Sequence, residues 1–207
     1  MAESVLGHRQ WTEQVPVQSP PTLSQRVARS LLLLFGWRVD IRWPPAPKAV
    51  VVVYPHTSNW DFVVGILGRA AAGLPLSWMA KDTLFRWPFG AFFRKLGGIP
   101  VNRREHKGAV AQMQADFARR PWLWLVIAPE GTRGFTPHWK SGFYRLACAA
   151  QVPLGLGYID YGRRIVGIAD WITLCGDSER DLARLRAFYA DKKALKPAQA
   201  GAIRFRD

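Results

Sequence analysis

The chain has 207 residues, of which 49% are apolar and 21% charged, and this balance excludes a globally disordered protein. Its 29 basic residues outnumber 15 acidic ones, which gives a net charge of +14, and it contains ten tryptophans. A basic surface rich in indole rings favours an anionic partner, namely a phospholipid surface, an acidic carrier protein or a nucleic acid.

The N-terminal region predicts a leader followed by one helix. Residues 1–21 end in two prolines and predict a flexible leader that lacks the basic start and apolar core of a signal peptide. Residues 22–36 predict an amphipathic helix, with leucines and a valine on one face and arginines opposite. This helix either anchors the protein on a membrane surface or packs on its own domain. Its run "LLLLF" is far shorter than the roughly 20 residues that span a bilayer.

The following segments alternate between strand and helix patterns. Residues 49–55, "AVVVVYP", are continuously apolar and predict a strand buried on both faces. The other expected strands are "LSWMAK", "GGIPVN", "WLWLVIAP", "PLGLGYI" and "RIVGIA", and the expected helices span residues 59–72, 87–96, 106–119, 140–151 and 178–195. This alternation predicts one α/β domain over residues 22–195, with a mainly parallel central sheet flanked by helices, and a loose tail over residues 196–207.

The first motif is "VVVYPHTSNWDF", which places His56 just after a strand and Asp61 five positions later. Five helical steps would turn the two side chains about 140° apart, so only a strand–loop–helix turn brings them together. A carboxylate on one imidazole nitrogen fixes the tautomer and leaves the other nitrogen to take a proton. Alternatively, Ser58 to Asp61 matches a capping box, in which Asp61 only caps a helix. These twelve residues leave both roles open.

The second motif is "IAPEGTRG", which follows another apolar strand with Glu130, Gly131, Thr132 and Arg133 on a turn. A glycine lets the backbone approach a ligand, the threonine offers a hydroxyl, and the arginine offers a fork that matches phosphate. The alternative is an ordinary polar turn on the surface.

Two further cations are expected at strand ends, Lys81 after "LSWMA" and Arg103 after "GGIPVN". Singly, each is typical of a solvated surface. The sequence contains no G-x-S-x-G elbow and no histidine or cysteine cluster at metal-ligand spacing. Because a histidine, a carboxylate and several cations all follow strands, the pattern favours a general base that activates a hydroxyl on an anionic amphiphile.

Four motifs together resemble those of the glycerolipid acyltransferase family, whose archetype is 1-acyl-sn-glycerol-3-phosphate acyltransferase. They are "HTSNWD", "GGIPVNRR", "APEGTRG" and "VPLGLGY", in this order over residues 50 to 160, and Lys81 in "MAKDTL" matches a lysine that is common in the family. The resemblance implies a glycerol-3-phosphate acyltransferase-like fold. It also implies that His56, held by Asp61, deprotonates an acceptor hydroxyl that attacks the thioester of acyl-CoA or acyl carrier protein.

The resemblance further implies which residues bind substrate and which groups take part. Acyl-CoA or acyl carrier protein is the co-substrate, and no cofactor or metal is required. The expected acceptor is 1-acyl-glycerol 3-phosphate in phospholipid biosynthesis, with a lyso-ornithine lipid as an alternative, because Ala128 and Gly134 depart from the usual third motif. The implied substrate-binding residues are Lys81, Arg103, Glu130, Gly131, Thr132 and Arg133.

The expected setting is the cytoplasmic face of a bacterial membrane, where the protein is peripheral and meets an anionic lipid surface. An alternative from another class is a basic nucleic-acid-binding module. The basic residues are spread along the chain, and no helix-turn-helix, zinc-finger or RNA-binding signature is present, which favours the enzyme. A relative that binds lipid without catalysis is a further alternative, and the intact histidine and acidic residues argue against it.

Overall fold

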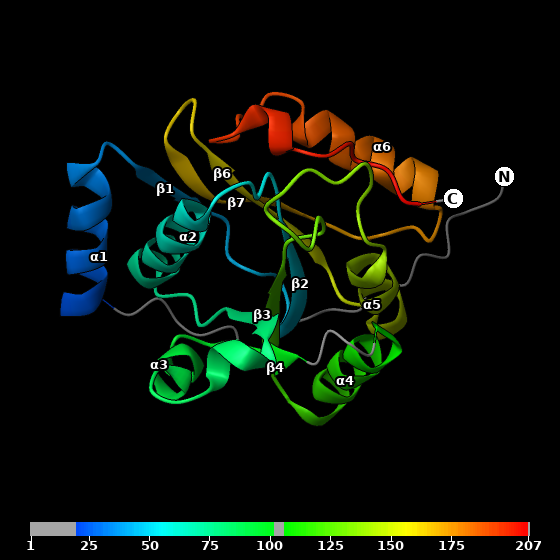
Figure 1. Ribbon diagram of the computed structural model, residues 1–207, viewed down its shortest axis with the longest axis horizontal. Coiled ribbons are helices and arrows are strands. Elements are labelled where there is room, and N and C mark those ends of the chain that lie inside the picture. Colours follow the sequence, from blue (N-terminus) through cyan, green and yellow to red (C-terminus); the bar gives the residue numbers. More distant parts are fainter. Residues whose placement is uncertain (1–19, 102–105, 207) are drawn as a thin grey trace, which may run out of the picture.

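A seven-stranded sheet forms the centre of the computed structural model, which describes residues 20–101 and 106–206 (Figure 1). The strand order is β1-β7-β6-β2-β5-β3-β4, and all neighbouring strands run parallel except β6 and β7. This confirms the α/β fold with a mainly parallel sheet. The strands are β1 (Arg38–Ile41), β2 (Lys48–Val53), β3 (Ser77–Lys81), β4 (Gly98–Val101), β5 (Leu123–Ile127), β6 (Leu154–Asp160) and β7 (Ile165–Ile172).

Helices cover both faces of the sheet, and the two faces can be read from β2. Val50 and Val52 are buried in a cluster shared with α4, α5 and α6, whereas Val51 faces the other way. On that other side, α1 and α2 pack over β6 and β7. The helices are α1 (Leu23–Leu34), α2 (Asn59–Ala72), α3 (Gly90–Lys95), α4 (His106–Arg119), α5 (Gly142–Ala150) and α6 (Ser178–Tyr189), with 3₁₀ turns η1 (Asp82–Phe85) and η2 (Pro197–Gln199).

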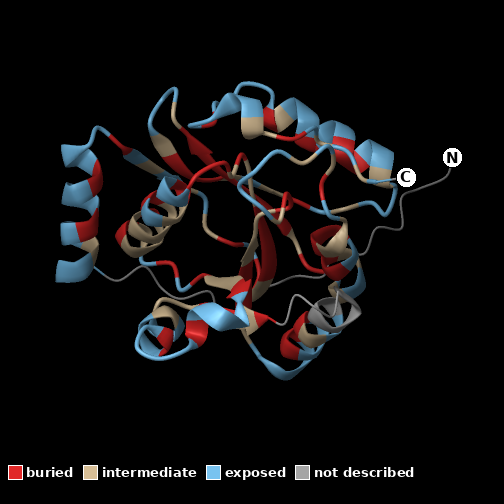
Figure 2. Cartoon of the chain, viewed as in Figure 1, coloured by how far each residue is buried: buried red, intermediate tan, exposed pale blue. Residues whose placement is uncertain are grey.

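The structure supports one of the two roles that the sequence left open for helix α1, namely packing on its own domain. Ala28 and Leu32 are buried against α2, so the helix packs on its own domain. Leu23 and Leu34 remain 78% and 76% exposed, and Figure 2 shows the buried stripe of α1 turned towards α2. Within the described residues, no helix has the length and apolar character that crossing a bilayer requires.

Three elements differ from the sequence-based expectation. Strand β1 was not predicted, because "RVDI" is short and carries two charges, as suits a strand at the edge of a sheet. The helix expected over residues 87–96 is limited to Gly90–Lys95, after the 3₁₀ turn η1 and a proline. The last helix ends at Tyr189 and not at residue 195.

The C-terminal residues 196–206 also differ from the loose tail that the sequence predicted. The ring of Phe205 packs on Tyr144 and Phe143 of α5, with centroids 5.4 and 6.0 Å apart. The backbone N–H of Trp139 donates to the carbonyl of Arg204 at 2.8 Å. The apolar residues of "AIRFRD" are too few to form a recognisable pattern, and only the surface of α5 gives them a place to pack.

Candidate active site

The His56 loop connects the carboxyl end of β2 to the first turn of α2. Ser58 is the N-cap of α2, and its hydroxyl accepts a hydrogen bond from the N–H of Trp60 at 3.2 Å. The carboxylate of Asp61 returns to accept the N–H of Ser58 at 2.9 Å, which completes a capping box. Asp61 therefore does cap the helix, as one of the two sequence-based alternatives predicted.

The same carboxylate also meets the imidazole of His56. Oδ2 of Asp61 lies 3.2 Å from Nδ1 of His56 and accepts the N–H of Thr57 at 2.7 Å. The Asp61 side chain is only 1% exposed, whereas that of His56 is 23% exposed and faces a cavity. The pair that the motif predicted is thus formed, and Nε2 of His56 is the ring nitrogen left to serve a ligand.

Asp61 is held in its ionised form. Burial alone would raise the pKa of its carboxyl group, but hydrogen bonds from His56, Tyr161 and the Ser58 backbone outweigh burial and bring that pKa below its usual value. An ionised acceptor keeps the proton on Nδ1 and stabilises the imidazolium that forms when Nε2 takes a proton. This geometry and charge would suit a histidine that takes a proton on Nε2 while an ionised carboxylate orients its ring.

Tyr161 is a member of this group that the sequence did not indicate. It lies in the turn after β6, and its hydroxyl donates to Oδ1 of Asp61 at 2.7 Å. Its ring stands edge-on to that of Trp37, 5.0 Å between centroids. Burial and the bond to Asp61 raise the pKa of Tyr161 well above its usual value, so it stays a neutral donor. Because it is 100 residues from Asp61, no local pattern could connect them.

Glu130 ties the second motif to the His56 loop. Its Oε2 accepts the backbone N–H of His56 at 2.8 Å, and the residue is 1% exposed. Burial raises the pKa of the Glu130 carboxyl group, and the charge of Asp61 raises it further. Hydrogen bonds from the backbone N–H groups of His56 and Gly201 lower it, and the net pKa is about 7. Glu130 thus fixes the position of the loop, whereas the resemblance had implied a substrate-binding residue.

The turn that follows Glu130 borders the cavity. Gly131 has a φ of +66°, a conformation that favours glycine, and Nζ of Lys140 would lie 2.9 Å from a Cβ at this position. The hydroxyl of Thr132 accepts the N–H of Gly134 at 3.2 Å, which shapes the turn. Arg133 is exposed and lines the cavity.

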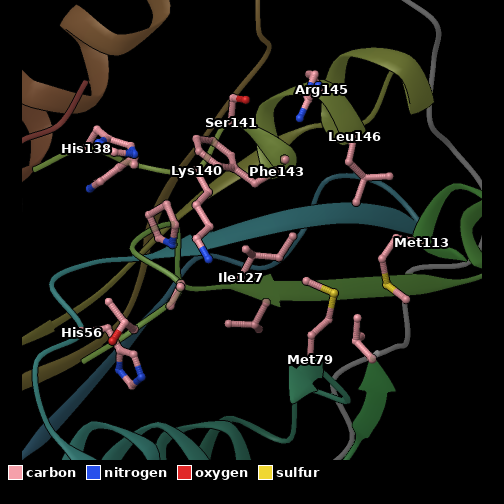
Figure 3. A pocket seen from close by; sticks show the side chains of 18 of the residues that line it. His56, Met79, Met113, Ile127, His138, Lys140, Ser141, Phe143, Arg145 and Leu146 are labelled. Atoms are coloured by element: carbon pink, nitrogen blue, oxygen red, sulfur yellow. The ribbon is translucent and has the colours of Figure 1, made fainter. Parts of the chain in front are cut away.

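The cavity has a volume of about 790 Å³ and is bounded by β5, the Glu130 turn and α5. Figure 3 shows His56 on one side and Arg145 on the opposite side, with Lys140 reaching between them. No acidic side chain lines it among the described residues. Its cations are Arg133, Lys140, Arg145 and Arg206, and its apolar wall includes Met79, Met113, Ile127, Phe143 and Leu146.

Two cations that the sequence predicted for the site are not among the described residues that line the cavity. Lys81 ends β3, as predicted, but it is exposed and does not line the cavity. Arg103 lies outside the described residues. The sequence missed Lys140, Arg145 and Arg206, since they follow no strand and belong to no motif that we singled out. In the described part of the chain, no group of three or more His, Cys, Asp or Glu side chains is placed to hold a metal ion.

Comparison with known proteins gives the family. The sequence matches the Acyltransferase family over residues 41–155. The chain belongs to this family and is an acyltransferase. The match confirms the acyltransferase assignment that the four motifs indicated.

One solved structure resembles this acyltransferase, and curated proteins gave no match. It is the 1-acyl-sn-glycerophosphate (LPA) acyltransferase PlsC from Thermotoga maritima, with a TM-score of 0.49 and 17% sequence identity, over 82% of this chain and 79% of that one. The family match includes His56, Asp61 and the Glu130 turn, whereas Tyr161 and the C-terminal segment lie beyond it.

Proposed function

We propose that this acyltransferase moves a fatty acyl group from a thioester donor to the free hydroxyl of a lysophospholipid-like acceptor. The observation that carries the proposal is the His56–Asp61 pair, 3.2 Å apart, at the edge of a cavity that has an apolar wall and, among the described residues, four cations. A base, anion-binding groups and an apolar surface are what an acidic amphiphile with a reactive hydroxyl requires.

In this proposal His56 acts as general base through Nε2. Asp61 keeps Nδ1 protonated, so Nε2 accepts the proton of the acceptor hydroxyl as its oxygen attacks the thioester carbonyl. The tetrahedral intermediate collapses with cleavage of the C–S bond, and the imidazolium returns its proton to the departing thiolate. The products are the acylated lipid and the free thiol of the carrier, and no covalent acyl-enzyme forms.

The cavity cations would bind the anionic groups of the substrates. Arg133 belongs to the Glu130 turn and lines the cavity, and Lys140 extends beside Gly131, which favours both as partners of an acceptor phosphate. Lys81 and Arg103 remain candidates from the family resemblance alone. We favour 1-acyl-glycerol 3-phosphate as acceptor, with a lyso-ornithine lipid as the alternative.

The donor is acyl-CoA or acyl carrier protein, and no cofactor takes part. The apolar wall around Met79, Met113 and Leu146 suits the fatty acyl chain of either donor. The excess of cations along the cavity favours a donor whose carrier is phosphorylated or acidic.

We also propose that the enzyme works at the cytoplasmic face of an anionic membrane as a peripheral protein. Three aromatic residues after η1 support this: Trp87, Phe89 and Phe92 are 94%, 64% and 56% exposed. Arg86 and Lys95 are exposed in the same segment. Aromatic rings beside cations suit the headgroup zone of an anionic membrane.

The test is an acyl-transfer assay with a panel of lysolipids. Purified protein is incubated with acyl-CoA or acyl carrier protein and with lysolipids that differ in headgroup. We expect a new acyl ester on 1-acyl-glycerol 3-phosphate, whereas ester formation only on a lyso-ornithine lipid would select the alternative acceptor. Absence of ester with every donor and acceptor would overturn the proposal.

A further inference from the structure

The C-terminal segment 196–206 is fastened to the loop that carries His56. The N–H of Lys196 donates to the hydroxyl of Thr57 at 3.3 Å, and the hydroxyl of Tyr54 donates to the carbonyl of Gly201 at 2.9 Å. Thr57 and Tyr54 stand on either side of His56 and its proline. The segment therefore contacts the His56 loop on both sides of His56.

The same segment is fastened to the Glu130 turn. The side-chain amide of Gln199, oriented to match its neighbours, donates to the carbonyls of Thr57 and Arg133, both at 2.9 Å. The N–H of Gly201 faces the carboxylate of Glu130 and lowers its pKa. One short stretch of chain thus joins the two motifs that form the site.

Beyond Gly201 the segment reaches α5 and the cavity. Nε of Arg204 donates to the carbonyl of Pro137 at 3.0 Å, and Phe205 packs on the rings of Phe143 and Tyr144. These contacts place the next residue, Arg206, among the residues that line the cavity. Arg206 lies beyond the residues matched by the family, which end at 155, whereas Arg133, Lys140 and Arg145 lie within them.

We infer that residues 196–206 belong to the active site. They hold the His56 loop against the Glu130 turn and supply Arg206 as an anion-binding cation. The inference rests on the proposed function for the nature of the anion. The positioning role is inferred from the hydrogen bonds that residues 196–206 make to the His56 loop. A base is effective only if its loop holds it to within about 0.5 Å of the reacting hydroxyl. Gly201 and Gln199 are positioning residues, and Arg206 is a substrate-binding residue.

The positioning role is tested with Gly201→Ala. A Cβ at Gly201 would lie 2.0 Å from the backbone oxygen of Thr136, so the segment must shift. We expect kcat to fall about tenfold and amide hydrogen exchange over residues 54–61 to become faster. The matched control is Gly65→Ala in α2, where the new Cβ meets only Ile159 at 4.0 Å.

Unchanged kcat and unchanged exchange in folded Gly201→Ala would overturn the positioning role. Thermal unfolding of the variant establishes that it is folded. Hydrogen exchange needs no substrate, so it tests the positioning role even if the wild-type protein transfers no acyl group and the proposed function fails.

The binding role is tested with Arg206→Ala. We expect KM for the substrate whose phosphate Arg206 meets to rise about tenfold at nearly constant kcat, with partial recovery in Arg206→Lys. Measuring KM separately for acyl-CoA and for 1-acyl-glycerol 3-phosphate identifies that substrate. The control is Arg180→Ala, which removes an exposed arginine of α6 outside the cavity. Unchanged KM for both substrates would overturn the binding role.

Discussion

At the scale of single residues, Asp61 performs two tasks because a carboxylate has enough acceptor positions for both. Oδ2 accepts the N–H groups of Thr57 and Ser58 and faces Nδ1 of His56, while Oδ1 accepts the hydroxyl of Tyr161. The motif spacing predicted the histidine contact and the helix cap as alternatives, and they coexist. Sequence reasoning could not find Tyr161, because only the β6–β7 turn brings it to Asp61.

Tyr161→Phe tests this second support of Asp61. Loss of the 2.7 Å hydrogen bond removes one of the groups that lower the pKa of Asp61, so that pKa rises. We expect kcat at neutral pH to fall about five- to thirtyfold, or roughly 1–2 kcal/mol, and the acid side of the pH–rate profile to move to higher pH. Tyr158→Phe is the matched control, since that hydroxyl donates to Asp40 away from the site. Equal profiles for both variants would contradict the role of Tyr161.

Glu130→Gln tests the buried carboxyl group through stability. The pKa of Glu130 is about 7 in the folded state and about 4.5 in the unfolded chain. Between pH 4.5 and pH 7 the carboxyl group is therefore protonated in the folded state and ionised in the unfolded chain. A raised acid pKa gives a contribution that is present below pH 4.5 and is lost as the pH rises through 7. Relative to Glu130→Gln, the wild type should lose about 2–3 kcal/mol of unfolding free energy between pH 5 and pH 8. Urea unfolding at several pH values measures this, and parallel curves would contradict it.

At the scale of elements, the sequence predicted the strands that are buried on both faces and missed β1 and the segment 196–206. Strands β2, β5 and β6 are continuous apolar runs, because helices cover the sheet on both sides. Strand β1 and the segment 196–206 carry mixed charged and apolar residues, and their structure depends on partners distant in sequence. The same limit applies to the site: motifs named the His56 loop and the Glu130 turn, but not the segment that joins them.

Leu32→Ala tests whether α1 is part of the domain. Leu32 is 2% exposed against α2, so its truncation should reduce the unfolding free energy by about 2–4 kcal/mol. Leu34 in the same helix is 76% exposed, and Leu34→Ala should cost less than about 0.5 kcal/mol. Denaturant unfolding of the two variants measures the difference. Similar small losses in both would mean that α1 is not held on α2 in solution.

At the scale of the whole molecule, the proposed membrane contact combines the net charge of +14 with the aromatic segment between β3 and β4. Phe85 and Phe93 of this segment pack inward around Trp78, whereas Trp87, Phe89 and Phe92 extend outward. The inward rings fix the segment, so the outward rings remain available to a partner. Charge and indole content favoured an anionic lipid partner from the sequence, and the proposed membrane contact assigns that partner to these exposed rings.

Substitution of these three outward aromatic residues by serine tests the proposed membrane contact. We expect co-sedimentation with anionic phospholipid vesicles to weaken about tenfold or more, because the rings lose their burial in the interface. Wild-type binding should also decline with added salt and be weaker on zwitterionic vesicles. Leu195→Ser, at a leucine 41% exposed, is the control for loss of an exposed apolar side chain. Unchanged sedimentation of the triple variant would place the membrane contact elsewhere, such as on the outer face of α1.

The most direct test of the account is the rate of acyl transfer by His56→Ala. Wild-type protein, a thioester donor and the best lysolipid acceptor are mixed, and kcat is compared with that of the variant and of His138→Ala, which removes another histidine of the cavity wall. A general base predicts a loss of about 10²- to 10⁴-fold in His56→Ala and a far smaller loss in His138→Ala. Equal turnover by wild type and folded His56→Ala would contradict the assignment of His56 as the base.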